Sequence, residues 1–301
     1  MFSEIWFALK VTICVIQNTL KEWAVYLFLS KKSVKGKIIL ITGGGKGIGR
    51  RLALALATQK PKHVILWGRD VESLKNTQSD IQAIGVEATY FKTDVSSREN
   101  IYKTAEEVQQ TIGPVNLLIN NAGVVCGKPL LDTTDSEFEY SLRVNTLAHI
   151  WTIKAFLPSM LESGEGHIVC MNSILGMMGL HGTADYTTTK FALTGLMQSL
   201  MVELQEYRGI SLSVIHPYQV QNEMFAGMSV RFPRLFPPLS EEYVVDQIMK
   251  AIQYRTKQLI LPAYFTPILF FKSVLPVSAM MATQRFFGLD KVMVNFKHKS
   301  S

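Results

Sequence analysis

Short apolar runs alternate with longer helical stretches from residue 37 onward. The apolar runs have the length of buried strands and cover residues 38–41, 63–67, 88–91, 115–119, 166–171 and 210–215. Strands that are apolar throughout are typical of a parallel sheet covered by helices on both faces. The alternation therefore predicts an α/β fold, a doubly wound Rossmann-type parallel sheet with right-handed crossovers.

Length and composition limit the kind of protein. A chain of 301 residues that is 48% hydrophobic suits one large α/β domain, which we expect over residues 36–260. The net charge of +7 is dispersed, so we expect no nucleic-acid partner and favour a cofactor phosphate or an anionic membrane. Cys14, Cys126 and Cys170 are far apart, which indicates neither disulfides nor a metal site and favours a reducing compartment.

A glycine-rich stretch, ITGGGKGIGR, follows the first apolar run and opens the first helix, for which we expect residues 50–60. Gly43, Gly47 and Gly49 allow a tight turn and let a pyrophosphate approach the helix N-terminus, where free N–H groups favour anions. A glycine loop alone also suits a flexible turn, but its place between strand and helix predicts dinucleotide binding.

The end of the second strand bears on which dinucleotide is bound. Arg69 stands where an acidic residue would select NAD, and its guanidinium can meet a 2′-phosphate. Lys46 in the glycine loop adds a second cation, whereas Asp70, one position later than the usual acidic residue, argues against this interpretation. We expect NADP(H), with solvated surface charges as the alternative explanation.

A helix near residue 190 carries a candidate acid–base pair. Tyr186 and Lys190 are four residues apart, which places phenol and ammonium on one helix face. A neighbouring cation favours the phenolate, so we expect the pKa of Tyr186 to be lowered from its usual value near 10. Ser173 ends a predicted strand at the carboxyl edge of the sheet, where its hydroxyl can hydrogen-bond a substrate carbonyl.

These motifs, in this order, resemble the short-chain dehydrogenase/reductase superfamily across residues 36–260. The resemblance implies that Tyr186 is the proton donor and acceptor, that Lys190 lowers its pKa and binds the nicotinamide ribose, and that Ser173 orients the carbonyl. It also implies that Asn145 holds a water that relays protons. The cofactor contacts that we expect are Thr42, Gly43, Gly45, Lys46, Gly47, Ile48, Gly49, Arg69, Asp94, Val95, Asn120, Ala122, Gly123, Tyr186, Lys190, Pro217, Val220 and Asn222.

One stretch departs from the family pattern. Tyr218 stands where glycine is usual after the sixth strand, and Asn222 stands where threonine is usual. Asn222 can still hydrogen-bond a carboxamide. Tyr218 puts the local turn and the fit of the cofactor in question.

Segments such as 227–239 are similar to a membrane-bound subgroup of the superfamily that acts on retinoids and steroids. The similarity implies NADPH-dependent reduction of all-trans-retinal to all-trans-retinol on the cytosolic side of the endoplasmic reticulum, with lipid droplets as a second location. It also implies a homodimer or a hetero-oligomer with a related dehydrogenase. Two alternatives stay open: oxidoreduction of steroids or other lipids, and a membrane or lipid-droplet scaffold with little turnover.

The N-terminal segment, residues 1–35, is predicted to be a membrane anchor. Residues 5–29 are mostly apolar but are interrupted by polar residues, and Lys10, Cys14, Gln17 and Lys21 share one helical face. We expect an amphipathic helix at the membrane interface rather than a clean span. A helix packed on the protein's own core is the alternative.

The region after the sixth strand is predicted to enclose an apolar substrate. A lid is expected at about residues 218–240, where Met224, Phe225, Met228, Phe232 and Phe236 cluster. Core packing is the alternative for each of these residues singly. The C-terminal extension, residues 261–301, is apolar but interrupted by prolines, so we expect a membrane-facing patch, with core cover or a dimer contact as alternatives.

Overall fold

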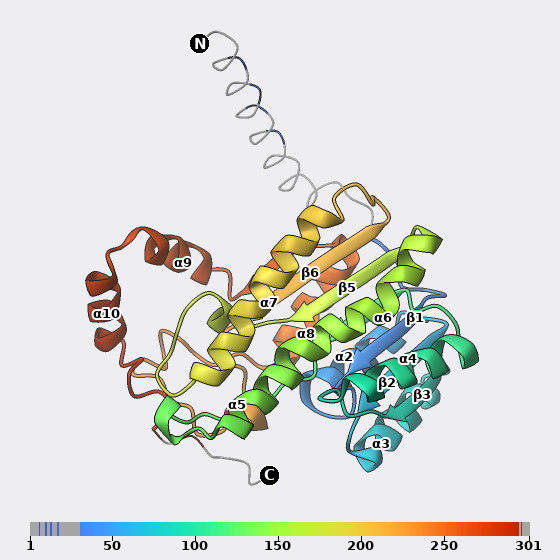
Figure 1. Ribbon diagram of the computed structural model, residues 1–301, viewed down its shortest axis with the longest axis horizontal. Coiled ribbons are helices and arrows are strands. Elements are labelled where there is room, and N and C mark those ends of the chain that lie inside the picture. The colour runs from blue at the N-terminus through green and yellow to red at the C-terminus, as the bar shows by residue number, and fades with distance from the viewer. Residues whose placement is uncertain are drawn as a thin grey trace.

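The computed structural model describes residues 31–294 and Phe296, together with Trp6, Lys10, Ile13 and Gln17. Seven parallel strands form one sheet in the order β3-β2-β1-β4-β5-β6-β7 (Figure 1). The doubly wound fold and the single α/β domain are confirmed. The strands are β1 (Ile38–Thr42), β2 (His63–Gly68), β3 (Glu87–Lys92), β4 (Leu117–Asn120), β5 (Gly166–Met171), β6 (Ile210–Pro217) and β7 (Gln258–Leu261).

Helices cover both faces of the sheet. The helices are α2 (Gly47–Ala57), α3 (Val71–Ala83), α4 (Arg98–Thr111), α5 (Asp135–Leu142), α6 (Ala148–Ser163), α7 (Ala184–Glu203), α8 (Glu241–Tyr254), α9 (Phe265–Val274) and α10 (Val277–Phe286). Shorter helical turns are η1 (Leu130–Asp132), η2 (Arg143–Leu147, a π-helical turn), η3 (Ile174–Gly176) and η4 (Glu223–Phe225).

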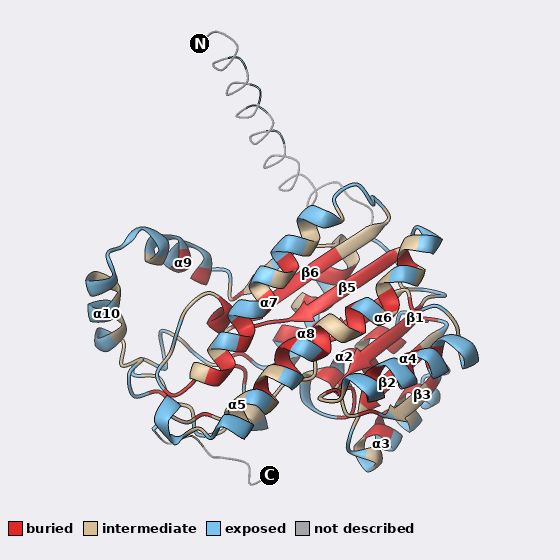
Figure 2. Ribbon diagram, in the orientation of Figure 1, coloured by how far each residue is buried: buried red, intermediate tan, exposed pale blue. Residues whose placement is uncertain are grey.

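The sheet separates two hydrophobic cores. Buried side chains of α2, α3 and α8 pack on one face, and those of α4, α6 and α7 pack on the other. Strands β1 and β4 are buried along their whole length (Figure 2). Because both faces are covered, nearly every position of these strands is apolar, with only the terminal Thr42 and Asn120 polar, which explains the continuous runs in the sequence.

The strand order reverses between β1 and β4, which are hydrogen-bonded neighbours. The connections that leave these two strands run to opposite sides, so a crevice opens at their carboxyl ends. Thr42 and Asn120 are the last residues of the two strands. The candidate site residues therefore meet at this edge.

Side chains cap the starts of α3, α4, α5 and α8. Asp70 accepts a hydrogen bond from the backbone of Ser73 at the start of α3, and Thr134 forms a capping box with Glu137 at the start of α5. Helix α2 differs, because Lys46 precedes it and supplies no side-chain cap. The first N–H groups of α2 are thus left to other partners.

Strand β7 was not predicted. It crosses the expected domain boundary at residue 260, and the apolar run from Leu259 continues towards a proline, which hides the strand in the sequence. Pairing with β6 makes this segment the edge strand of the sheet. Helix α2 also begins at Gly47 and ends at Ala57, three residues before the expected bounds at both ends, because the glycine loop itself enters the helix.

The predicted N-terminal anchor lies almost wholly outside the described residues. Within the part of the chain that the structure describes, no helix combines the length and apolarity that a bilayer span needs. In the C-terminal extension, Pro276 stands immediately before α10 and separates it from α9. The described part of the extension therefore holds two separate short helices and no continuous long one, in keeping with the interruption by prolines.

Backbone hydrogen bonds hold together the two ends of the segment predicted to be a lid, about residues 218–240. The backbone of Gln221 donates to Leu239, and that of Leu239 donates to Gln219. Within the resulting loop, the Phe232 ring lies 5.8 Å from that of Phe286, which belongs to α10. The lid and the C-terminal helices thus form one cover beside β6 and β7.

Candidate active site

The glycine loop joins β1 to α2 and packs tightly on itself. Gly43 and Gly47 have positive φ angles of 68° and 53°, which glycine adopts without strain. A Cβ at Gly49 would lie 2.2 Å from the Gly43 carbonyl oxygen, and one at Gly45 would lie 2.9 Å from the Ser73 hydroxyl. Two of the glycines are thus required by packing within the protein, in addition to any approach of a ligand.

Asn121 holds this loop against the end of β4. Its side-chain amide donates to the carbonyl of Thr42 at 3.0 Å, and the Thr42 hydroxyl accepts from the backbone of Asn121 and Ala122. Asn121 stands between the predicted contacts Asn120 and Ala122 but was not itself predicted. The sequence of residues 120–123 was the available signal, and it did not tell which asparagine faces the loop.

Helix α7 presents the candidate acid–base pair to the crevice. Tyr186, Thr189, Lys190, Leu193 and Met197 are buried, at the spacing of one helix face. The Lys190 ammonium donates to the carbonyl of Met171 at 2.9 Å and lies 5.3 Å from the centre of the Tyr186 ring. The four-residue spacing therefore brings the two groups together as expected.

Ser173 is held by a network around the end of β5. Its backbone donates to the Asn172 side chain, and its hydroxyl accepts from the backbone of Leu175. The Nδ1 atom of His216 lies 3.0 Å from the Ser173 carbonyl oxygen. Burial lowers the pKa of His216 to about 4, so the ring is neutral near pH 7. Because a carbonyl only accepts, Nδ1 must carry the proton.

Burial shifts the pKa values of Tyr186 and Lys190. It raises the pKa of the Tyr186 phenol, against an opposing contribution from the hydrogen bond with Ser173. It also lowers the pKa of Lys190 to about 8. The expected lowering of the Tyr186 pKa is therefore wrong for the protein alone, because the cost of burying the phenolate outweighs other influences.

Asn145 lies in the π-helical turn η2, buried beneath the site. Its amide oxygen accepts from the backbone N–H of Val124, and its amide nitrogen donates to the Val124 carbonyl, each at 2.8 Å. The same nitrogen donates to the Thr189 hydroxyl. Asn145 thus ties the loop after β4 to α7. Its predicted role in holding a water stays a prediction.

A groove of about 700 Å³ runs along the carboxyl edge of the sheet. The predicted residues that line it are Gly43, Gly45, Lys46, Gly47, Ile48, Gly49, Ala122, Gly123, Ser173, Tyr186, Lys190, Pro217, Val220 and Asn222. The glycine cradle and the uncapped start of α2 fit the phosphates of a dinucleotide, because they offer backbone N–H groups without side chains in the way.

The other predicted residues lie outside the groove lining. Thr42 and Asn120 are buried under it, where the side chain of Asn120 accepts from Thr152. Val95 is packed in the core, and the Asp94 carboxylate accepts from the backbone and hydroxyl of Ser96. Their cofactor contacts stay predictions.

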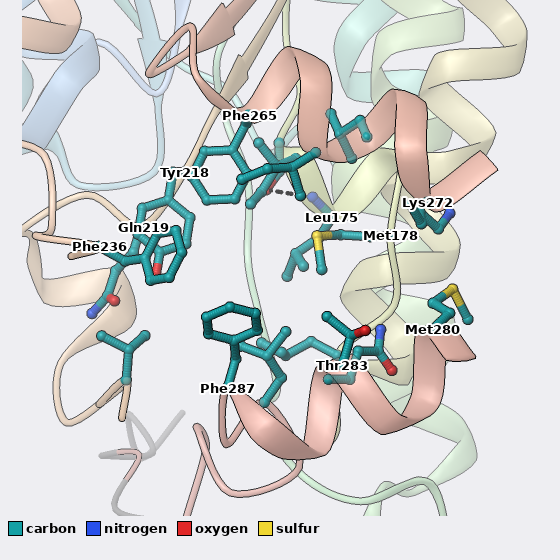
Figure 3. A pocket seen from close by; sticks show the side chains of 18 of the residues that line it. Leu175, Met178, Tyr218, Gln219, Phe236, Phe265, Lys272, Met280, Thr283 and Phe287 are labelled. Atoms are coloured by element: carbon teal, nitrogen blue, oxygen red, sulfur yellow. Dashed lines mark hydrogen bonds between the residues drawn. The ribbon is translucent and has the colours of Figure 1, made fainter. Parts of the chain in front are cut away.

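A second, apolar cavity of about 330 Å³ adjoins the groove (Figure 3). Leu175 and Met178 come from the segment after β5, Phe236 comes from the lid, and Phe265 and Phe287 come from the C-terminal extension. Ser173, Tyr218 and Phe225 line both the cavity and the groove. An apolar ligand would thus have its polar end near Ser173.

Comparison with known proteins decides the family. Residues 37–230 match the family described as short chain dehydrogenase. The chain is a short-chain dehydrogenase/reductase. The groove is what the Rossmann-type fold of this oxidoreductase family leads one to expect. Members of the family use NAD or NADP.

Individual relatives indicate which kind of short-chain dehydrogenase/reductase this chain is similar to. The chain is 42% identical to human short-chain dehydrogenase/reductase 3 over 87% of each chain. It is 37% identical to human epidermal retinol dehydrogenase 2, covering 92% of this chain and 91% of the relative. A metagenomic short-chain oxidoreductase solved in complex with NADP superposes with a TM-score of 0.65 at 28% identity, over 76% of this chain and 98% of that one. The enzyme is thus related to retinol dehydrogenases.

The two cations predicted to meet a 2′-phosphate have other partners in this dehydrogenase/reductase. Lys46 lines the groove and forms an ion pair with Asp70, which raises the pKa of Lys46. Arg69 does not line the groove; its guanidinium donates to the hydroxyl of Tyr140. A 2′-phosphate would have to compete with Asp70 for Lys46.

The tight packing of Gly49 gives the first prediction. Gly49→Ala should weaken NADPH binding about tenfold or more, a cost of about 1.4 kcal/mol, because its Cβ would force the Gly43 carbonyl out of the loop. A fluorescence titration of NADPH measures the change. Gly195→Ala is the matched control, since a Cβ there meets nothing within 4 Å. Equal affinities of the two variants would contradict the packing argument.

The buried lysine gives a prediction of pH dependence. The pKa of Lys190 falls from 10.5 to about 8 on folding, so the unfolded chain holds more protons between these values and stability rises with pH there. From pH 7 to 9.5, wild type should gain about 2 kcal/mol over Lys190→Met in free energy of unfolding.

Urea denaturation of both proteins at the two pH values checks this expectation. The change with pH is the readout, because the lost hydrogen bond to Met171 affects both pH values alike. Lys154→Met, at an exposed position of α6, should show no such change relative to wild type. A pH-independent gap between wild type and Lys190→Met would show that Lys190 is not perturbed by burial.

Proposed function

We propose that this enzyme reduces all-trans-retinal to all-trans-retinol with NADPH, at a site where Ser173, Tyr186 and Lys190 act on the carbonyl. The observation that carries the proposal is the meeting of the polar groove and the apolar cavity at Ser173. A long apolar molecule with one terminal carbonyl fits this arrangement. The similarity to relatives such as human epidermal retinol dehydrogenase 2 supports a retinoid as the substrate.

The catalytic roles follow from the protonation of the site. Tyr186 keeps its proton at neutral pH because burial raises its pKa, and a proton donor for reduction needs this form. The Ser173 hydroxyl donates a hydrogen bond to the substrate carbonyl and stabilises the developing alkoxide. Bound NADPH supplies the hydride. Lys190, with a pKa of about 8, keeps most of its positive charge near Tyr186 at pH 7.

NADP(H) is the cofactor that we propose. Lys46 stands at the start of α2 on the groove, where its ammonium would meet a 2′-phosphate in place of Asp70. Arg69 follows β2 and would join it by leaving the Tyr140 hydroxyl. A relative solved with NADP supports the same preference.

Membrane attachment on the cytosolic face of the endoplasmic reticulum, or on lipid droplets, belongs to the same proposal. On α9 and α10, Phe270, Val274, Val277 and Phe286 are each exposed by more than 60% of their surface. These helices also line the mouth of the cavity through Phe271 and Met280 (Figure 3). An apolar substrate dissolved in lipid could then enter without crossing water.

A turnover assay tests the reaction and the cofactor together. Membranes from cells that express the enzyme should convert all-trans-retinal to retinol with NADPH, and much less with NADH. Tyr186→Phe should lose at least about a hundredfold in kcat because it has no proton to give, while NADPH still binds. Tyr207→Phe, at an exposed tyrosine, is the matched control.

Normal turnover by Tyr186→Phe would refute the catalytic assignment. Absence of retinol with either cofactor, but turnover of a steroid ketone, would shift the substrate to the steroid class. Absence of turnover on both substrates, together with an unchanged cellular phenotype of Tyr186→Phe, would favour a scaffold.

The membrane-facing surface has its own test. A polarity-sensitive fluorophore at Phe270→Cys should shift to blue when vesicles that contain anionic lipid are added to the full-length enzyme, because the residue enters the acyl region. The same label at Val202→Cys, an equally exposed position on α7, should report water. Equal spectra from both positions would contradict docking through α9 and α10.

A further inference from the structure

Tyr218 occupies the junction between the two cavities. It directly follows Pro217, the last residue of β6, and it lines both the groove and the apolar cavity. Tyr218 departs from the family pattern, because glycine is usual at this place. The structure shows what the side chain does there.

The backbone at this position does not require glycine. The Tyr218 N–H donates to the Leu261 carbonyl at 2.7 Å, which continues the pairing of β6 with β7. Tyr218 is not among the residues with positive φ. A large side chain is therefore accommodated without backbone strain, and its ring is directed by packing.

The ring is fixed by aromatic neighbours from two other elements. Tyr218 stacks on Phe265 at the start of α9, with 4.8 Å between ring centres and 28° between planes. Phe265 is itself stacked on Tyr264 and lies 6.0 Å from Phe236 of the lid. Figure 3 shows Tyr218, Phe265 and Phe236 gathered at one end of the cavity. These rings form a wall that bends less than an aliphatic one.

The rest of the cavity lining mixes further aromatic rings with flexible aliphatic side chains. Leu175, Met178 and Met280 contribute flexible side chains, which adapt to several ligand shapes. The Tyr218 ring packs against the hydrophobic core as well as on Phe265, so apolar contacts hold it in place. Next to Ser173, the flat face of the Tyr218 ring therefore limits which substrate shapes can fit.

We propose that Tyr218 is a specificity-determining residue, whose ring, held against Phe265, forms a flat wall beside Ser173 that accepts a planar conjugated chain and disfavours the thicker skeleton of a steroid. The inference rests on the proposed function in naming the retinoid. It adds that the C-terminal extension shapes the substrate site through Phe265. Tyr218 positions the substrate and is given no chemical role.

Kinetics with two substrates test this inference on the full-length enzyme. For Tyr218→Ala, kcat/KM for all-trans-retinal should fall about tenfold or more, mainly through KM. The preference for retinal over a steroid ketone should shrink at saturating NADPH, a condition that removes any effect of the substitution on the groove that Tyr218 also lines. Tyr218→Phe should keep the preference, because the ring and its stack remain. Phe265→Ala should reproduce part of the loss, and the double variant Tyr218→Ala/Phe265→Ala should add little to Tyr218→Ala.

Tyr218→Leu is the control for a loss of folding in Tyr218→Ala. Leucine keeps an apolar side chain at the junction but no flat face, so it should share the loss of preference while binding NADPH normally. An unchanged preference in Tyr218→Ala and Tyr218→Leu, or a loss in Tyr218→Phe, would overturn the inference.

Binding without turnover separates this inference from the proposed function. The fluorescence of all-trans-retinol, and its displacement by a steroid, report the ligand preference of the NADP-saturated enzyme. Failure of wild type to reduce retinal would refute the proposed function only. In that case, a drop in the retinol-to-steroid binding ratio in Tyr218→Ala would still support the role of Tyr218, and an unchanged ratio would overturn it.

Discussion

The parallel pairing of β1 with β4 is the constraint on which the site depends. The chain turns to opposite sides after these two strands, and the crevice that results cannot be filled by either crossover. The glycine loop lies at one wall and the Asn121 segment at the other, joined by hydrogen bonds to Thr42. Because these contacts link two strands that are far apart in sequence, the groove exists only once the sheet has formed.

Burial of polar groups governs the chemistry of this groove. Tyr186, Lys190 and Asn145 are almost fully buried, which keeps the phenol protonated and brings the pKa of the lysine down to about 8. The neutral His216 ring adds a hydrogen bond to the Ser173 carbonyl. A protonated phenol, a nearby lysine and a positioned hydroxyl thus share a site that excludes much of the water, which is the arrangement on which the proposed reduction depends.

The C-terminal extension does more than follow the catalytic domain. It begins at the end of the edge strand β7, which completes the sheet, and its helices supply much of the wall of the apolar cavity. The stack of Tyr218 on Phe265 joins this wall to the end of β6. The helices α9 and α10 thus line the apolar cavity on one side and expose large apolar side chains on the other, and the proposed substrate recognition and membrane contact both depend on them.

The sequence by itself determined the fold class, the glycine loop and the pairing of Tyr186 with Lys190, because each depends on local periodicity or on short spacing. Only the tertiary structure decided that Asn121 holds the loop, that Tyr218 stacks on Phe265, and that burial raises the pKa of Tyr186. These facts depend on contacts between segments distant in sequence, and on how much water each group loses. Neither quantity is encoded in the spacing of residues along the chain.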